Sequence, residues 1–435
     1  MQFTSTRNGK DTVSFSQAIL HCLPKDGGMY VPAYSEDLRP WINYMDESTS
    51  FQSIAGALTS ALMKEEFSPL ISEAIATRSF PFSPELKQLD DSLYELELFH
   101  GPTGTHKDFG LSYLTNSIEH ILWYQEKTAV VLAVTNGETG ASIVQACRGK
   151  KHIKAVLFFE PGTMRGFNES DCVWNGGNIY PVEVQADRKT IASLIGDVYR
   201  TPELMEKYNL TLANTVNIGR LLSHSFFYMY AFSRLRKKVW GDIYYALNEN
   251  NFGNLVAGLY SWKFSLPVNG FITNSSPSLT LAADGTCFVL DSLVPLKDRG
   301  ASDPVNPSNI ERLEEIFATS APVMKGLVFP VNVTNDEAQE ACKELFMKYG
   351  EFADLATSRA YAAAKKRIQM EEDEESTVVL VAADHPSLHC DEIRHACGES
   401  PSMPDRIKDI YVPVKPVKKI KPDRKSIELI LKELN

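Results

Sequence analysis

The chain has 435 residues, of which 43% are hydrophobic and 23% are charged, a composition typical of a globular protein with two or three compact units. Its formal net charge of −11 argues against nucleic acid as the main partner, because binding to phosphate backbones needs a basic face. No run approaches the roughly 20 apolar residues that span a bilayer, so we expect no membrane partner.

The first ninety residues mix turn signals with helical patterns. The stretch DGGMYVPAY, from Asp26 to Tyr34, predicts a tight turn that leads into a short strand. Between residues 50 and 80, apolar side chains recur at helical spacing, as in Ile54, Leu58 and Leu62. We expect residues 1–90 to form a separate N-terminal region.

From Leu93 onwards, short apolar strands alternate with helices. Continuous apolar strands separated by helices indicate mostly parallel sheets that are covered on both faces, an α/β fold. Ligands bind such sheets beyond the carboxyl ends of the strands. We expect an α/β core over residues 91–390 and a C-terminal tail over 391–435. The segments that carry this pattern are Thr128–Lys150, Ile153–Gly162, Asn178–Val184, Asp242–Phe264 and Ser376–Pro386.

The cysteines and the N-terminus bear on the cellular compartment. Seven cysteines are scattered along the chain without a CxxC pair, which argues against a disulfide framework and favours a reducing compartment. The stretch from Met1 to Asp11 lacks the apolar run of a secretory signal. We therefore expect a cytoplasmic protein.

Two loops between a strand and a helix have the composition of anion-binding turns. NNFGN, from Asn250 to Asn254, offers backbone N–H groups at a helix start, and Asn tolerates left-handed backbone angles. TNGETG, from Thr135 to Gly140, has the same character. A plain polar turn explains either loop equally well when it is taken alone. The chain has neither GxxxxGK[ST] nor GxGxxG, which leaves smaller phosphorylated ligands.

Lys107 lies where a Gly- and Pro-rich loop meets an apolar helical run, in HGPTGTHKDFG. A lysine amine can form a Schiff base when burial or cationic neighbours lower its pKa. A surface lysine near a helix start is the simpler interpretation on spacing alone.

A group of His and Cys residues, His385, His389, Cys390, His395 and Cys397, could supply zinc ligands. Its spacing matches no common zinc pattern. We therefore assign no metal to it.

Several motifs in this order together resemble threonine synthase, a family of fold type II enzymes that depend on pyridoxal phosphate (PLP). The resemblance spans nearly the whole chain and implies two α/β lobes around a cleft, with an N-terminal region beside them. It also implies a lyase that converts O-phosphohomoserine and water to threonine and phosphate. The motifs are STR (5–7), DGGMYVP (26–32), HGPTGTHKDF (100–109), TNGETGA (135–141), GGNIYPV (176–182), YNLTLANTVNIGRLL (208–222), NFGNLVAG (251–258) and NPSNIERLEEIF (306–317).

The resemblance also implies roles for individual residues. Lys107 would form the Schiff base with PLP and then move protons. Asn217 and Arg220 would bind the phosphate of the substrate. The cofactor phosphate would be held by Asn250, Asn251, Phe252, Gly253 and Asn254, and the remainder of the substrate by Thr135, Asn136, Gly137, Glu138 and Thr139.

The sequence departs from the family pattern at four loops, one of which is the substrate loop, where Asn136 and Glu138 replace the serine and the aspartate of S-G-D-T-G-A. Glu249 and Asn250 replace the Ser-Gly that opens the family's S-G-N-F-G-N loop. In the family's A-T-A-H-P turn, Ala383 stands where the threonine serves the pyridine nitrogen, and the next residue, Asp384, is our candidate for this contact. Ala356 replaces the histidine of D-P-H-T-A. Two alternatives therefore stay open: a PLP lyase for another phosphorylated amino acid, such as phosphoserine, and a non-catalytic relative of the family.

Overall fold

The computed structural model describes residues 1–168, 170, 177–282, 285, 287–289, 294–371 and 375–434. Two sheets dominate it, one of six strands and one of five. The expected fold class, α/β with mostly parallel sheets, is confirmed. Among the described helices, none is both long and apolar enough to cross a bilayer.

The larger sheet has the strand order β14-β11-β10-β15-β5-β4, and all its pairs are parallel except that of β4 with β5. Alternate residues of its central strands enter different cores: Tyr245 packs with α9 and α10, whereas Ala246 packs with α13. The sheet is therefore covered on both faces, as expected. Its elements are β4 (Glu85–Gln88), β5 (Leu93–Glu97), β10 (Ile243–Leu247), β11 (Gly270–Asn274), β14 (Val328–Val331), β15 (Thr377–Ala382), α9 (Ile218–Leu235), α10 (Gly253–Lys263), α12 (Asn335–Tyr349) and α13 (Leu355–Glu371).

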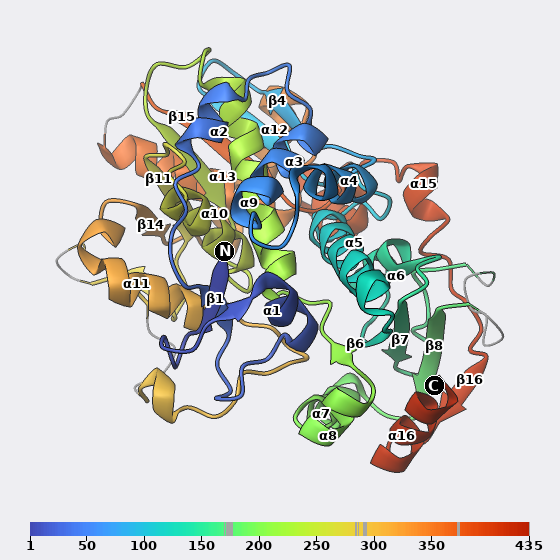
Figure 1. Cartoon of the computed structure of the whole chain (residues 1–435). Coiled ribbons are helices and arrows are strands. Elements are labelled where there is room, and N and C mark those ends of the chain that lie inside the picture. The colour runs from blue at the N-terminus through green and yellow to red at the C-terminus, as the bar shows by residue number, and fades with distance from the viewer. Residues whose placement is uncertain are drawn as a thin grey trace.

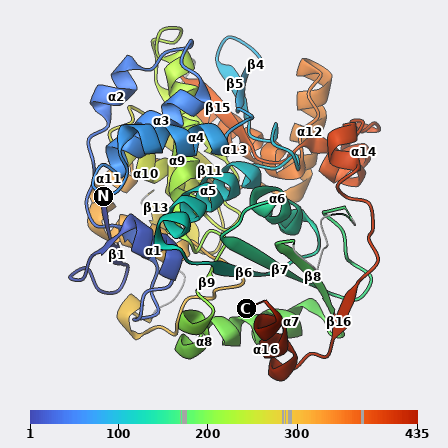
Figure 2. The ribbon, with the colours of Figure 1, turned by 45° about the vertical axis from the view of Figure 1, so that its right-hand side comes forward.

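The smaller sheet has the order β16-β8-β7-β6-β9, and all its pairs are parallel. Figure 2 shows β6, β7 and β8 with α5 and α6 above them and α7 and α16 below. The strand β16 forms one edge of this sheet and pairs with β8, although more than 230 residues separate the two strands. Its elements are β6 (Ala129–Val134), β7 (Ile153–Phe159), β8 (Ile179–Val184), β9 (Leu210–Thr211), β16 (Lys418–Ile420), α5 (Lys107–Gln125), α6 (Glu138–Cys147), α7 (Arg188–Tyr199), α8 (Pro202–Lys207) and α16 (Arg424–Glu433).

The N-terminal residues form a small sheet and four helices that lie beside both larger units (Figure 1). The predicted turn at Asp26 leads into β3, and the helical pattern of residues 50–80 forms α3 and α4. Each of these two helices begins after a serine, Ser50 or Ser68, whose hydroxyl accepts a backbone N–H three residues further on. The elements are β1 (Gln2–Ser5), β2 (Val13–Ser14), β3 (Tyr30–Pro32), α1 (Phe15–His21), α2 (Arg39–Tyr44), α3 (Phe51–Leu62) and α4 (Pro69–Ser79).

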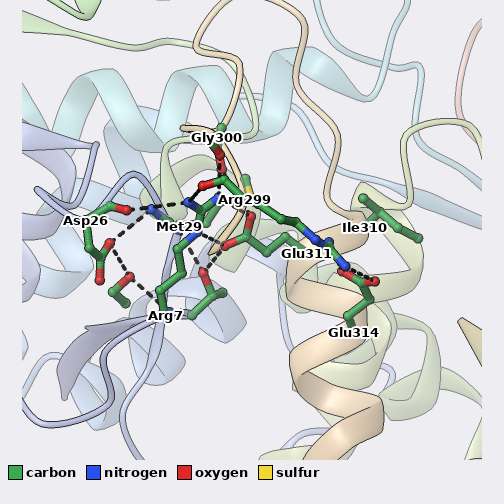
Figure 3. A network of polar contacts seen from close by, with 12 residues as sticks. Arg7, Asp26, Met29, Arg299, Gly300, Ile310, Glu311 and Glu314 are labelled. Atoms are coloured by element: carbon green, nitrogen blue, oxygen red, sulfur yellow. Dashed lines mark hydrogen bonds and ion pairs between the residues drawn. The ribbon is translucent and has the colours of Figure 1, made fainter. Parts of the chain in front are cut away.

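Figure 3 shows the polar contacts between the segment that follows the N-terminal strand and α11. Arg7 forms a buried ion pair with Glu311 at 2.9 Å and donates to the backbone carbonyls of Arg299 and Gly300 at 2.8 Å each. Two motifs that are distant in the sequence, STR and NPSNIERLEEIF, therefore meet: Arg7 and Glu311 are 304 residues apart. The division into residues 1–90, 91–390 and 391–435 stays a prediction. The remaining elements are α11 (Ile310–Met324), α14 (Cys390–Cys397), α15 (Asp405–Lys408), β12 (Leu279–Leu281), β13 (Cys287–Val289) and the short 3₁₀ helices η2 (Leu296–Asp298) and η3 (Pro386–His389).

Candidate active site

Lys107 is the first residue of α5, and the loop before it is held against the loop that follows β15. The His106 N–H donates to the Ala383 carbonyl, and the His385 N–H donates to the Gly104 carbonyl, both at 2.7 Å. Gly104 has a φ of +76°, which favours glycine at this turn. Because β5 and β15 are parallel neighbours, these two loops meet at one edge of the sheet, and Lys107 is brought to Asp384.

Asp384 is the centre of a cluster of charged groups. Its carboxylate lies 3.7 Å from the Lys107 Nζ, 3.5 Å from the His106 Nδ1 and 3.7 Å from the His389 Nε2. Burial opposes its ionisation, but Lys107, His106 and His389 outweigh burial and hold the pKa of Asp384 well below its ordinary value. Asp384 therefore faces the lysine as an anion and does not point to the surface.

His389 is the basic partner of this carboxylate. The contact with Asp384 raises the pKa of His389 to about 9, and Asp354, at 3.9 Å from the His389 Nε2, acts in the same direction. Burial raises the pKa of Asp354, and the neighbouring Asp384 adds to this effect. At neutral pH the cluster therefore holds a protonated His389 beside an ionised Asp384.

Within the described part of the chain, the His and Cys residues that suggested a zinc site do not gather around one point. The His389 ring lies beside Asp354 and Asp384. The possible metal-binding atoms of these three residues lie within 4.8 Å of one another. The Cys397 Sγ instead lies 3.6 Å from the Cys342 Sγ.

The loop from Asn250 to Asn254 leads into the N-terminus of α10. Asn250 has a left-handed φ of +38°, as expected for an anion-binding turn, but the second left-handed residue is Phe252 with φ +60°, not Asn251. Asn251 instead accepts the Gly253 N–H through its side chain at 3.1 Å. The Asn254 carbonyl accepts the Tyr228 hydroxyl at 2.6 Å. The loop therefore forms the start of a helix, where backbone N–H groups can bind an anion.

Glu249 precedes this loop and is a half-buried carboxylic acid. Its Oε2 is buried and has no hydrogen-bond partner among the described residues. Burial raises the pKa of Glu249. Glu249 therefore keeps its proton to a higher pH than an exposed glutamate, and in the protonated form it can donate a hydrogen bond.

The loop after β6 is organised by Thr135, whose hydroxyl accepts the N–H groups of Gly137 and Gly140 at 3.0 and 2.9 Å. Gly137 has a φ of +111°, and a Cβ there would meet the Arg165 side chain at 2.3 Å. The side chains of Asn136 and Thr139 are half-buried and that of Glu138 is exposed. This loop opens α6 as the Asn250 loop opens α10.

Asn217 and Arg220 lie at the start of α9 and are both buried. The Asn217 amide donates to the carbonyls of Ile19 and Leu212 at 2.8 and 3.0 Å and accepts the Gly219 N–H, so it caps the helix. Arg220 donates through Nη1 to the Ala213 carbonyl at 2.9 Å, while its Nε has no partner among the described residues. Of the two, Arg220 keeps a donor for a ligand.

The sequence motifs gave no role to several residues that shape this site. His224 is 1% exposed, both of its ring nitrogens lack a described partner, and its ring lies 5.5 Å from that of His106. Asn309 donates to the Asn251 carbonyl and to the Thr215 hydroxyl, and so joins two of the loops. Asn309 lies within the motif NPSNIERLEEIF, so the sequence could have indicated it. His224 lies in none of the quoted motifs, and nothing in the sequence indicated a role for it.

The arrangement brings the Lys107 amine to the Asp384 carboxylate beyond the ends of β5 and β15, and the start of α10 follows β10, the neighbour of β15. The start of α6 follows β6 of the smaller sheet, and Arg220 supplies a buried guanidinium from α9. An amine in this setting can form a covalent bond with a carbonyl compound and can exchange protons. The helix starts and the guanidinium can bind anions.

Comparison with known proteins agrees with this geometry. Residues 2–80 match the family described as threonine synthase N terminus. Threonine synthase from Haemophilus influenzae is 25% identical over 412 residues, and that from Escherichia coli is 26% identical over 413 residues; each alignment covers 94% of both chains. The crystal structure of PLP-bound threonine synthase from Brucella melitensis shares the fold, with a TM-score of 0.82 and 20% identity over 99% of both chains.

The N-terminal match and the two relatives that align along 94% of the chain show that this chain is similar to threonine synthases, and its fold is that of a PLP-bound threonine synthase of fold type II.

Proposed function

We propose that this chain is a PLP-dependent threonine synthase, a lyase that converts O-phosphohomoserine and water to L-threonine and phosphate. The observation that carries the proposal is the position of Lys107. Its amine lies 3.7 Å from the Asp384 carboxylate, at the edge where the lysine loop meets the loop after β15. A lysine without a chemical role has no physical need for this partly buried position.

The residues present fit PLP. Lys107 would hold the aldehyde, and the loop of Asn250, Asn251, Phe252, Gly253 and Asn254 would hold the phosphate. The unpartnered Oε2 of Glu249 supports this fit, because a protonated carboxyl beside the loop can donate to a phosphate oxygen. Asp384 would pair with the pyridine nitrogen as an anion. When bound, PLP supplies an electron sink for negative charge on the adjacent carbon atoms.

The chain's own residues would then bind substrate and move protons. Lys107 would exchange protons with the substrate as general acid and base. The free Nε of Arg220 would donate to the substrate phosphate, and Asn217 would hold Arg220 in place by capping α9. The start of α6, with Thr135, Asn136, Gly137, Glu138 and Thr139, would bind the substrate carboxylate.

The other partners and the compartment follow from the same proposal. The ligand is a small phosphorylated amino acid, and nucleic acid and membrane have no part in the reaction. The described cysteines, six in number, are free thiols, which supports a reducing compartment such as the cytoplasm.

The first test is the visible absorbance of the purified protein with added PLP, before and after borohydride reduction, beside Lys107→Ala. We expect a band that depends on Lys107 and that borohydride converts to a stable covalent adduct. We also expect phosphate release from O-phosphohomoserine, reduced about 1000-fold or more in Lys107→Ala because the proton carrier is lost.

The alternatives give different results in the same assay. Phosphate release from O-phosphoserine but not from O-phosphohomoserine would assign the lyase another substrate. A protein without the Lys107-dependent band would be a non-catalytic relative of the family.

A further inference from the structure

A cavity of about 420 Å³ lies beside α5, between the end of α4, the second half of α6 and α15. Its charged lining is mostly basic: Arg78, Arg148, Lys150 and Arg406 line it, together with a single acidic residue, Asp108. We call this the basic cavity. It stands out in a chain whose formal net charge is −11.

Three cations of the basic cavity, Arg78, Lys150 and Arg406, have little acidic compensation among the described residues. Among the described residues, no carboxylate forms an ion pair with Arg78, Lys150 or Arg406. The Lys150 ammonium donates to the neutral Asn116 amide at 2.8 Å, and Arg406 donates to the backbone carbonyls of Phe99 and His100. Positive groups that converge in this way repel one another unless an anion joins them.

The two nearby acids are already engaged. The Asp108 carboxylate accepts the N–H and the hydroxyl of Thr103, both at 2.7 Å, and burial raises its pKa to about 6. Glu119, which acts electrostatically on Lys150, accepts the N–H groups of Lys151 and His152. Among the described residues, neither acid forms an ion pair with Arg78, Lys150 or Arg406, and two carboxylates are fewer than the four cations that line the basic cavity.

The basic cavity is separate from the candidate active site. Asp108, Ser112 and Asn116 line it and lie four residues apart, on one face of α5. Gly110 lies on the opposite face, where a Cβ would meet the side chains of His224 and Arg220. The helix therefore separates the basic cavity from Arg220, the residue proposed to bind the substrate phosphate.

The remaining lining suits an organic molecule as well as an anion. Phe82 and Pro102 form an apolar part of the wall, and Asn116 and Ser112 add polar groups. The volume falls within the range of small-molecule sites. Guanidinium and ammonium groups from three separate segments can surround a tetrahedral phosphate, whose charge exceeds that of a single carboxylate.

We propose that the basic cavity binds a small organic phosphate at a second site, with its phosphate at Arg78, Lys150 and Arg406 and its organic part against Phe82 and Pro102. The site does not depend on the proposed reaction. It lies against the loop from Phe99 to Thr105, which leads to Lys107.

The test is calorimetric titration of the full-length protein, saturated with PLP, with inorganic pyrophosphate and with adenosine diphosphate at about 50 mM salt. We expect saturable binding with a dissociation constant below about 1 mM. The double variant Arg78→Gln/Lys150→Gln should bind both probes about tenfold or more weakly, because two charge-assisted contacts are lost. Higher salt should weaken binding to the wild type.

A matched control is Arg188→Gln/Lys189→Gln, which removes two exposed charges from the start of α7. It should change the affinity by less than about twofold. Absence of binding in the wild type, or equal affinity in the wild type and the Arg78→Gln/Lys150→Gln variant, would overturn the proposal. The same holds if the control loses as much affinity as that variant, because net charge alone would then explain the effect.

Discussion

The carboxyl group of Glu249 lies one residue before the loop that opens α10, with a buried and unpartnered oxygen. An ionised carboxylate there would repel a phosphate, whereas a neutral one would donate to it. Burial raises the pKa of Glu249 above its ordinary value and so favours the neutral form. The affinity for PLP should therefore fall as the pH rises through this raised pKa.

Glu249→Gln should remove this pH dependence, because the amide is neutral at every pH and still donates a hydrogen bond. We expect the variant to bind PLP about fivefold or more tightly than the wild type at alkaline pH, and nearly equally at mildly acidic pH. Titration of the visible absorbance at several pH values measures this, with Glu203→Gln on the exposed side of α8 as control. Weaker binding by Glu249→Gln at all pH values would show that the carboxylate itself is needed.

Asp384 and His389 control each other's charge. The raised pKa of His389 stems first from its contact with Asp384, at 3.7 Å. This pair should stabilise the fold fully below pH 6.5, the ordinary pKa of histidine, and lose that contribution as the pH approaches about 9.

Asp384→Asn should lower the pKa of His389 from about 9 by roughly one pH unit or more, because its main anionic partner is lost. The histidine ring signals in a nuclear magnetic resonance titration report this pKa, and His389→Gln identifies the signal. Asp391→Asn, a neutralisation on the exposed surface of α14, serves as control. A pKa of His389 that stays near 9 in Asp384→Asn would assign the shift to Asp354 instead.

At the scale of elements, α11 joins parts of the chain that are distant in sequence. Arg312 is fully buried and donates to the carbonyls of Tyr30, Thr215 and Val216 at 3.0, 2.6 and 2.7 Å, and to the Asn309 side chain at 2.8 Å. One planar guanidinium thus binds β3, the loop before α9 and the start of its own helix. Through Asn309 the same group of contacts reaches the loop that opens α10.

Arg312→Met should destabilise the protein by about 2–4 kcal/mol, because several buried carbonyls lose their donor. Arg312→Lys should lose nearly as much, since a single ammonium cannot reach acceptors in three segments. The melting temperature of the full-length protein measures both effects, with Arg39→Lys on the surface of α2 as control. A lysine variant as stable as the wild type would mean that charge alone, without the planar geometry, is sufficient.

For the whole molecule, the buried acid Glu95 contributes to the response of stability to pH. Glu95 lies in β5, and burial, with Glu97 and Glu351 nearby, raises its pKa from 4.5 to about 8. The folded protein therefore keeps this proton at pH values where the unfolded chain has lost it. The contribution of Glu95 to stability is greatest below pH 4.5 and falls as the pH rises to about 8, by about 1.4 kcal/mol for each pH unit.

Glu95→Gln should therefore raise the melting temperature at pH 9 more than at pH 5. Melting curves at both pH values measure the difference, with Glu340→Gln on the exposed surface of α12 as control. An equal effect of Glu95→Gln at the two pH values would mean that the wild-type carboxyl is ionised throughout, and that its neighbours compensate for burial.

Much of the fold follows from local patterns in the sequence. Short apolar runs such as Val378–Ala382, followed by polar turns, predict parallel strands because only fully covered strands are apolar on both faces. The order of the motifs around Lys107, Asn250 and Thr135 indicates the family because each motif is read over a few adjacent residues. The sequence by itself thus determined the fold class, the lysine and the two loops that open α6 and α10.

Only the tertiary structure decided which side chains meet. The contacts of Asp384 with Lys107 and of Arg312 with Tyr30 join residues that lie far apart in the chain. The same holds for Arg78, Lys150 and Arg406, which line one cavity. Burial likewise raised the pKa of Glu249 and of Glu95, because the desolvation of a carboxyl group depends on neighbours from the whole fold. Sequence patterns report periodicity along the chain, whereas hydrogen bonds, ion pairs and pKa values depend on distances through space.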